Sequence, residues 1–283
     1  MSAALLPEVP EAQASAGIAH IYSEIRRLSA VPLVALIYRH LAAIPGGLDW
    51  AWSELQPFME RGELQERAWA LAEQVPMPHL TPLPEAALRV AGVSAAAQPA
   101  VLNILDAYNR TNPINLMGVT WLARRLVGRP AVTPKVTGRS TWTPPAMLDE
   151  MPAMIHPSQM DANTLALTRL LTDRHPDAAA STLVPSLYRH LAHWPGVLGY
   201  AATVLSPVWA DVDVAAQALR DLAQQRVDEL EQLSIPGVSA SASVPDVPPE
   251  LRAALLQFGQ RIPEMIVIGS SLREALKSGT KIF

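Results

Sequence analysis

One stretch of this sequence occurs twice, and the repetition restricts the folds open to the chain more than any other feature. The segment VPLVALIYRHLAAIPGGL at 31–48 aligns without a gap with STLVPSLYRHLAHWPGVL at 181–198, an offset of 150 residues. The same offset aligns further pairs near the end of each copy: Tyr108 with Phe258, Pro113 with Pro263, Leu122 with Leu272 and Leu126 with Leu276. Because solenoids usually need at least three repeats, two copies predict two related halves that form a pseudo-two-fold dimer within one chain.

The duplication and the prolines divide the chain into four expected segments. These are an N-terminal extension (1–17), a first helical repeat (18–128), a proline-rich linker (129–164) and a second helical repeat (165–283). The chain has 26 prolines among 283 residues, nearly twice the usual share of roughly 5%. They cluster between stretches of helical pattern, where a residue without a backbone N–H interrupts a helix. The prolines therefore indicate helix boundaries.

Both copies have the hydrophobic spacing of a helix. Apolar residues recur at intervals of four, four and three on one helical face: Leu33, Ile37, Leu41 and Ile44 in the first copy, and Leu183, Leu187, Leu191 and Trp194 in the second. A Pro-Gly pair follows each set and is expected to end both helices. Other stretches are rich in Ala and Leu with a helical period, and we find no alternating strand pattern. The predicted fold class is all-α.

Composition excludes several classes of function. Hydrophobic residues make up 49% of the chain, charged residues 17%, and the net charge is −4, so neither a disordered chain nor a nucleic-acid partner is expected. The chain has no cysteine, which excludes disulfides, thiolate nucleophiles and cysteine-bound zinc. No stretch resembles a signal peptide or reaches the length of a membrane span. We expect a soluble cytoplasmic protein without a cofactor.

Three segments carry a resemblance to a known family: VPLVALIYRHLAAIPGGLDWAWSELQP (31–57), TNPINLMGVTWLARRL (111–126) and LYRHLAHWPGVLGYAATVLSP (187–207). Their layout resembles the group I, or DehI-type, 2-haloacid dehalogenases along nearly the whole chain. The resemblance implies an all-α pseudo-dimer with its site between the halves. It also implies hydrolytic displacement of halide from a small 2-haloalkanoic acid, with an aspartate that activates water, and is compatible with a homodimer.

At several family positions this sequence carries different residues. The family aspartate immediately precedes Tyr-Arg of the second copy, where this chain has Leu187, and the equivalent position in the first copy is Ile37. Leu33 replaces an aromatic residue, while Asn112 retains the family asparagine. The substrate-binding residues that we predict are Asn112, Ser186, Leu187, Leu33 and Ile37. Two hypotheses follow: a dehalogenase with a rearranged base, or a non-catalytic protein that binds a small carboxylic acid or a partner.

Two of these residues also have a structural interpretation. Asn112 precedes Pro113, a pattern typical of an N-cap followed by proline at the first helical position. Ser186 can cap its own helix in the same way. Asp211 and Asp213 are expected to cap the following helix, and the alternative is a replacement general base.

The repeated histidines and arginines have competing interpretations as well. His190 and His193, with His40, have a spacing that suits a metal site, but no carboxylate completes a known motif, and Tyr188 to His190 are expected to face away from the apolar stripe. The alternative for these histidines is a hydrogen-bonding role at the surface or between the repeats. Arg39 and Arg189 suit either a clamp for a ligand carboxylate or an ion pair with an acid in the same repeat. The tryptophans are expected to pack in the core.

Overall fold

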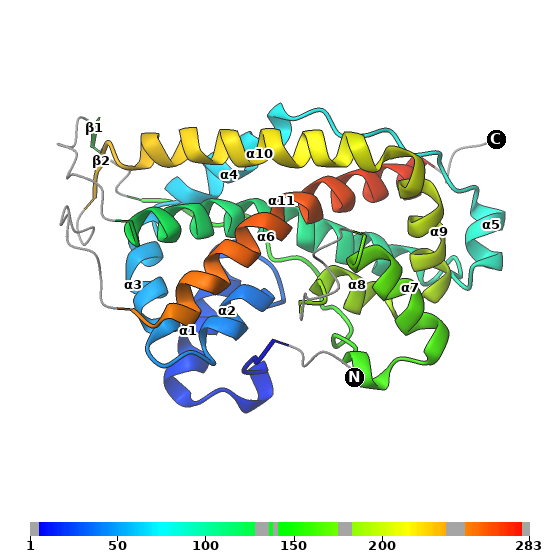
Figure 1. Cartoon of the computed structure of the whole chain (residues 1–283), viewed down its shortest axis with the longest axis horizontal. Coiled ribbons are helices and arrows are strands. Elements are labelled where there is room, and N and C mark those ends of the chain that lie inside the picture. Colours follow the sequence, from blue (N-terminus) through cyan, green and yellow to red (C-terminus); the bar gives the residue numbers. More distant parts are fainter. Residues whose placement is uncertain (1–5, 128–135, 138–140, 175–182, 236–246, 279–283) are drawn as a thin grey trace.

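The computed structural model describes residues 6–127, 136–137, 141–174, 183–235 and 247–278, and these residues are predominantly helical (Figure 1). The first half contains α1 (Ala16–Ser29), α2 (Leu36–Leu41), α3 (Gly47–Met59), α4 (Glu63–Gln74), α5 (Glu85–Val90) and α6 (Gln98–Arg125). The second half contains α7 (Ala162–Thr172), α8 (Ser186–Leu191), α9 (Pro195–Leu205), α10 (Trp209–Leu230) and α11 (Pro249–Ser278). Two-residue strands β1 (Val136–Thr137) and β2 (Leu233–Ser234) pair in parallel. The all-α prediction is confirmed.

The helices of the two halves follow one another in a similar order. Helix α8 begins and ends 150 residues after α2, which is the offset of the sequence repeat. Each half ends in a long helix, α6 or α11. The repeat boundaries and the pseudo-two-fold relation remain predictions. Parts of the predicted segments lie outside the described residues: 1–5 of the extension, 128 of the first repeat, 129–135 and 138–140 of the linker, and 175–182, 236–246 and 279–283 of the second repeat.

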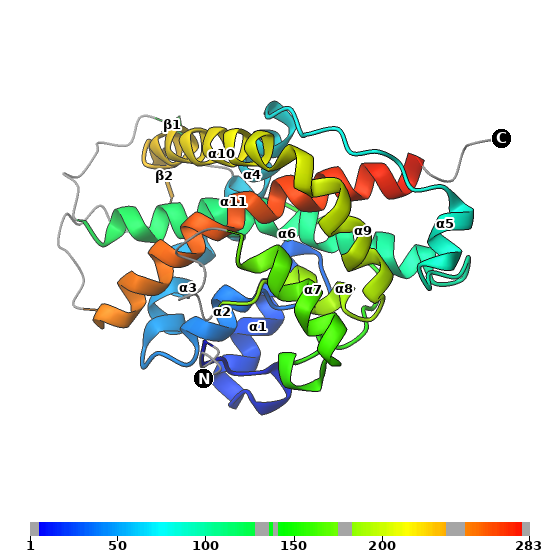
Figure 2. The same cartoon turned by 45° about the vertical axis from the view of Figure 1, so that its right-hand side comes forward.

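Helices α6 and α11 pack against each other at the centre of the molecule (Figures 1 and 2). Helices α4 and α10 pack on one side of this pair. On the other side, α2 of the first half packs on α11 of the second, and α8 of the second half packs on α6 of the first. Buried apolar residues of both halves form one continuous core. The short helices therefore meet around the central pair.

The helices predicted at the repeated stretch were too long. Leu33 precedes α2 and Ile44 follows it, and α2 and α8 end at Leu41 and Leu191, before the Pro-Gly pairs. Pro195 is the first residue of α9, where its missing N–H has no partner to lose. Gly46, in contrast, caps α3 with φ of 69°, a conformation open to glycine.

Both long helices continue through a proline. Pro113 lies inside α6 and Pro263 inside α11, so the prediction that Asn112 caps a helix start was wrong. A proline inside a helix removes one backbone hydrogen bond and disturbs the preceding turn. The apolar packing on both sides of α6 and α11 offsets this cost, since residues around each proline are buried.

Side chains at the tryptophan positions pack as predicted. Trp52 and Trp121 are buried, and Trp50, Trp194 and Trp209 are half-buried against the core. Within the part of the chain that the structure describes, we find no helix that combines the length and the hydrophobicity required to span a membrane.

Candidate functional site

A small cavity lies between α6, α11 and the starts of α2 and α8. Its volume is about 40 Å³, which is room for a few water molecules or a ligand of a few heavy atoms. Its lining residues are Ala35, Leu36, Ile37, Tyr108, Asn112, Asn115, Leu183, Pro185, Ser186, Leu187, Phe258, Arg261, Ile262 and Met265. We call it the inner cavity. It brings together four of the five predicted site residues, Asn112, Ser186, Leu187 and Ile37, whereas Leu33 is buried and does not line it.

The two central helices contribute different side chains to the inner cavity at equivalent positions of the repeat. Helix α6 contributes the polar side chains Tyr108, Asn112 and Asn115, which share a helical face because they are four and three residues apart. At the same positions of the repeat, α11 contributes apolar side chains, Phe258, Ile262 and Met265. The duplicated scaffold therefore holds a site with different chemistry on its two sides.

No acidic side chain is found among the described residues that line the inner cavity. Leu187, at the position of the family aspartate, is 1% exposed and packs as an apolar residue. Ile37, its equivalent in the first copy, lines the same cavity. Neither side chain can accept a proton.

A polar contact between Tyr108 of the first repeat and His190 of the second borders the inner cavity, in line with the inter-repeat interpretation of the histidines. The Tyr108 hydroxyl lies 2.7 Å from Nδ1 of His190. His190 is 4% exposed. Desolvation by burial lowers the pKa of His190 to about 4, and the charges of His193 and Arg189 add to this effect. His190 is therefore neutral at pH 7 and can serve as a hydrogen-bond acceptor.

Asn115 adds a further acceptor. Its side chain is 2% exposed, and its carbonyl oxygen Oδ1 is buried without a hydrogen-bond partner among the described residues. A buried polar atom without a partner costs free energy unless a ligand or water satisfies it. In the sequence, Asn115 is one of several polar residues in an apolar helix, so only the fold identifies it.

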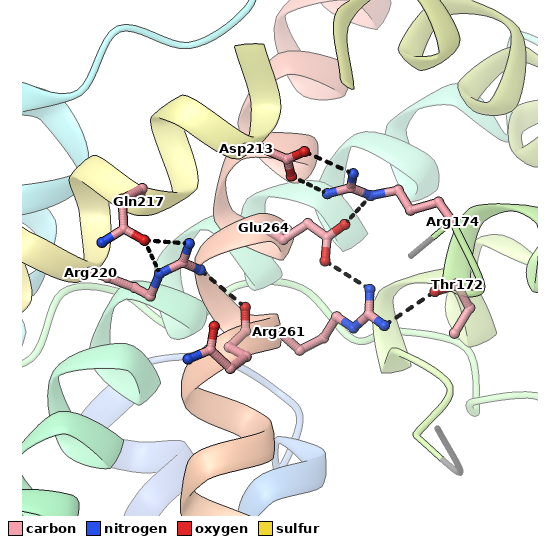
Figure 3. Close-up of polar contacts among 8 residues, drawn as sticks. Thr172, Arg174, Asp213, Gln217, Arg220, Arg261 and Glu264 are labelled. Atoms are coloured by element: carbon pink, nitrogen blue, oxygen red, sulfur yellow. Dashed lines mark hydrogen bonds and ion pairs between the residues drawn. The ribbon is translucent and has the colours of Figure 1, made fainter. Parts of the chain in front are cut away.

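Arg261 lines the inner cavity, and a network of ion pairs and hydrogen bonds holds it in place (Figure 3). Its Nη1 donates to Glu264 at 2.8 Å and its Nη2 to the Thr172 carbonyl at 3.1 Å. Glu264 also accepts from Arg174, which in turn binds Asp213 at 2.7 Å. The carboxylate of Glu264 is therefore engaged by two guanidinium groups.

The expectation that Asp211 and Asp213 cap a helix was wrong. Helix α10 starts earlier, at Trp209, because the 3-10 turn Ser206–Val208 runs directly into it, and Asp211 falls in its first turn. Both side chains are exposed, and neither lines the inner cavity. Ser186 is the first residue of α8 and makes no capping hydrogen bond.

Arg39 and Arg189 share one carboxylate. Glu8, in the N-terminal extension, lies 2.9 Å from Nη2 of Arg39 and 3.1 Å from Nη1 of Arg189. The ion-pair interpretation was right in kind, but the acid comes from outside both repeats. Glu8 and Arg189 line an outer cleft of about 410 Å³, which shares Leu36 and Leu183 with the inner cavity.

The histidines do not converge on a metal-binding geometry in the described part of the chain, where we find no cluster of three His, Asp or Glu side chains. His40 lies 2.6 Å from the Pro7 carbonyl, and exposed His193 lies 2.8 Å from the Ala153 carbonyl. Tyr188 to His190 were expected to face away from the apolar stripe of this segment. All three are buried because a helix of only six residues is covered on several sides.

Comparisons with known proteins give a likeness at the level of structure. No family model matches the sequence, and no curated protein matches it. The chain is similar to a D-2-haloacid dehalogenase mutant with D-2-CPA (TM-score 0.68, 19% identity, 97% of this chain and 95% of that one). It is also similar to D-2-haloacid dehalogenase with L-LA (0.68, 19%, 99% and 98%) and to another mutant (0.67, 19%, 97% and 95%). Over nearly its whole length, the chain has the fold of D-2-haloacid dehalogenase.

Proposed function

We propose that this protein is a divergent relative of the group I 2-haloacid dehalogenases that binds a small carboxylic acid in the inner cavity. In this proposal it lacks the aspartate-assisted displacement of that family. The observation that carries the proposal is the pair Leu187 and Ile37, two apolar residues at the equivalent positions where a base would reach the ligand. Hydrolysis of a carbon–halogen bond needs a group that takes the proton of the attacking water.

The lining of the inner cavity suits a short acid. Arg261 supplies a guanidinium group that attracts a carboxylate, and Asn112 supplies an amide. The apolar wall of Phe258, Ile262 and Met265 suits a short alkyl chain, and a volume of about 40 Å³ excludes a long one. The structural neighbours with D-2-CPA and L-LA support a small ligand.

The test is calorimetric titration of the full chain with propionate, both enantiomers of lactate and both of 2-chloropropionate, together with an assay for chloride. We expect at least one acid to bind and no chloride to appear with either chloro enantiomer. Octanoate, which is too long for the inner cavity, is the matched ligand control. The proposal fails if none of the short acids binds.

Hydrolytic dehalogenation is the second candidate, favoured by the presence of Asn112 at the inner cavity of a dehalogenase fold. Chloride release by the unchanged protein would establish it. Leu187→Asp tests whether the rest of the site is intact: a carboxylate there would be desolvated and therefore a stronger base. We expect the variant to gain slow chloride release, and Leu187→Asn, of similar size without a basic carboxylate, to gain none.

A further inference from the structure

Two arginines at equivalent positions of the repeat converge on one carboxylate at the outer cleft. We propose that Arg39 and Arg189 form a carboxylate-binding site separate from the inner cavity. Glu8 fills this site from within the chain, and a larger carboxylic acid in the outer cleft occupies it by displacing the Glu8 side chain. The proposal does not depend on the ligand proposed for the inner cavity.

The Arg39–Arg189 pair has the geometry of a carboxylate clamp. The two residues are 150 positions apart and occupy the same place in α2 and α8. Their guanidinium groups bind different oxygens of Glu8: Oε1 accepts from Nη1 of Arg189 at 3.1 Å, and Oε2 lies 2.9 Å from Nη2 of Arg39. Both arginine side chains are largely buried. The three side chains together carry one excess positive charge, which attracts an anion.

Glu8 does not use the full hydrogen-bonding capacity of Arg39. Its Oε2 is close enough to Nη2 of Arg39 for an ion pair, but neither this oxygen nor Nε of Arg39 has a hydrogen-bond partner among the described residues. Arginine binds a carboxylate best through two parallel N–H···O contacts. A free acid can turn to make these contacts, whereas Glu8 is restrained by its own backbone. A free carboxylate therefore has hydrogen bonds to gain at this site.

Displacement of Glu8 needs only a rotation of its side chain. The main chain on both sides of Glu8 is fixed by hydrogen bonds: the Pro7 carbonyl lies 2.6 Å from Nδ1 of His40, and the Val9 N–H donates to the Arg39 carbonyl at 2.9 Å. The Glu8 side chain itself lines the outer cleft, whose volume of about 410 Å³ has room for it beside a ligand. Glu8 can therefore turn away while its backbone stays in place.

The outer cleft determines the kind of acid that fits. Its volume lies within the range of small-molecule pockets, roughly 300 to 1,000 Å³, and is about ten times that of the inner cavity. Leu36, Leu183 and Val184 supply an apolar surface beside Arg189, and Gln13 adds an amide. This lining suits a monocarboxylic acid with an apolar body of about six to ten heavy atoms, such as an aromatic acid.

Benzoate is the probe for the experiment, because its ring suits the outer cleft and is too large for the inner cavity. Benzyl alcohol is the control of similar size without a carboxylate. In Glu8→Ala the competing carboxylate is removed, so calorimetry at pH 7 should detect saturable binding of benzoate and none of benzyl alcohol. Absence of benzoate binding by folded Glu8→Ala, or equal binding of both compounds, would overturn the proposal.

The unchanged protein tests the displacement itself. It should bind benzoate about 100-fold more weakly than Glu8→Ala, as measured by NMR titration, because the acid competes with a carboxylate attached to the chain. If benzoate at these higher concentrations leaves the spectrum of the unchanged protein unaltered, Glu8 is a fixed structural partner and the displacement is disproved.

Further substitutions in the Glu8→Ala background locate the site and guard against loss of folding. Added Arg39→Gln removes a buried charge that lacks its partner, so it should raise the urea midpoint while it weakens benzoate binding about tenfold or more. Added Arg26→Gln is the matched control, because Arg26 pairs with Glu11 and does not line the outer cleft. Val184→Phe narrows the outer cleft alone and should also weaken binding. Benzoate affinity that is unchanged by Arg39→Gln and Val184→Phe would overturn the assignment.

Discussion

The buried imidazole of His190 should make the free energy of unfolding depend on pH. The pKa of His190 is lowered to about 4 by burial, while an unfolded histidine titrates near 6.5. Between these values the unfolded chain binds a proton at this residue and the folded chain does not. The free energy of unfolding therefore falls as the pH is lowered from about 6.5 to about 4.

The expected contribution of His190 to this fall is about 3 kcal/mol, and urea unfolding at pH 7 and pH 4 measures it. His190→Gln should be less stable at pH 7, since it loses the contact with Tyr108, but should lose about 3 kcal/mol less between the two pH values. His20→Gln, at an exposed histidine of α1, is the control and should follow the unchanged protein. An equal loss in His190→Gln would contradict this assignment.

At the residue scale, the sequence predicted the part of the inner cavity that the repeat and the resemblance mark. Asn112, Ser186, Leu187 and Ile37 come together as a group, although their role in binding a substrate remains a prediction. A hydrogen-bonding role at the surface or between the repeats was one interpretation of His190, whereas Tyr108 was identified only as a match in the repeat. Tyr108 and His190 are 82 residues apart in the sequence, and their contact depends on the way α8 packs on α6. Hydrophobic spacing does not predict that packing.

At the scale of elements, the N-terminal extension is fixed to the two repeats by charge. Glu8 joins Arg39 of α2 and Arg189 of α8, and the three side chains are largely buried. Removing the charge of one partner leaves the guanidinium groups buried without compensation, which is costly in a low-dielectric environment. The segment around Glu8 therefore stabilises both short helices at once.

Glu8→Gln should lower the free energy of unfolding by about 3 kcal/mol, as measured by urea denaturation at pH 7. Glu24→Gln is the matched control, because Glu24 pairs with Arg27 on the surface and exposed pairs contribute at most about 1 kcal/mol. High salt should reduce the effect of Glu24→Gln and leave that of Glu8→Gln nearly unchanged. Similar losses in both variants would argue against a buried ion pair at Glu8.

The elements themselves were predictable in type and less so in extent. Apolar spacing indicated helices in both copies, and helices are found there. The apolar spacing overestimated the length of α2 and α8. Leu33 and Ile44 are buried although they lie outside α2, so their spacing does not mark a longer helix. The pair Asn112 and Pro113 resembled a helix start, but α6 continues through the proline. Tertiary packing stabilises this continuation, and a local sequence pattern contains no information about that packing.

At the scale of the whole molecule, the two Pro-Gly pairs have different structural roles, although they occupy equivalent positions of the repeat. Gly46 takes a positive φ at the start of α3. Gly196 lies inside α9 of the second half, against the end of α5 in the first half, and a Cβ there would lie 2.0 Å from the Ala91 main-chain oxygen. This glycine therefore permits a backbone contact between the halves that its counterpart does not make.

Two substitutions in α9 test this contact between the halves. Gly196→Ala should lower the free energy of unfolding by about 2 kcal/mol, because main-chain atoms cannot move aside as a flexible side chain can. Gly199→Ala, three residues further along the same helix, meets nothing within 4 Å and should raise it by up to about 1 kcal/mol through helix propensity. Chemical denaturation of both variants gives the comparison. Since both substitutions add the same methyl group to one helix, opposite signs can arise only from the approach of α9 to α5, and equal signs would contradict that approach.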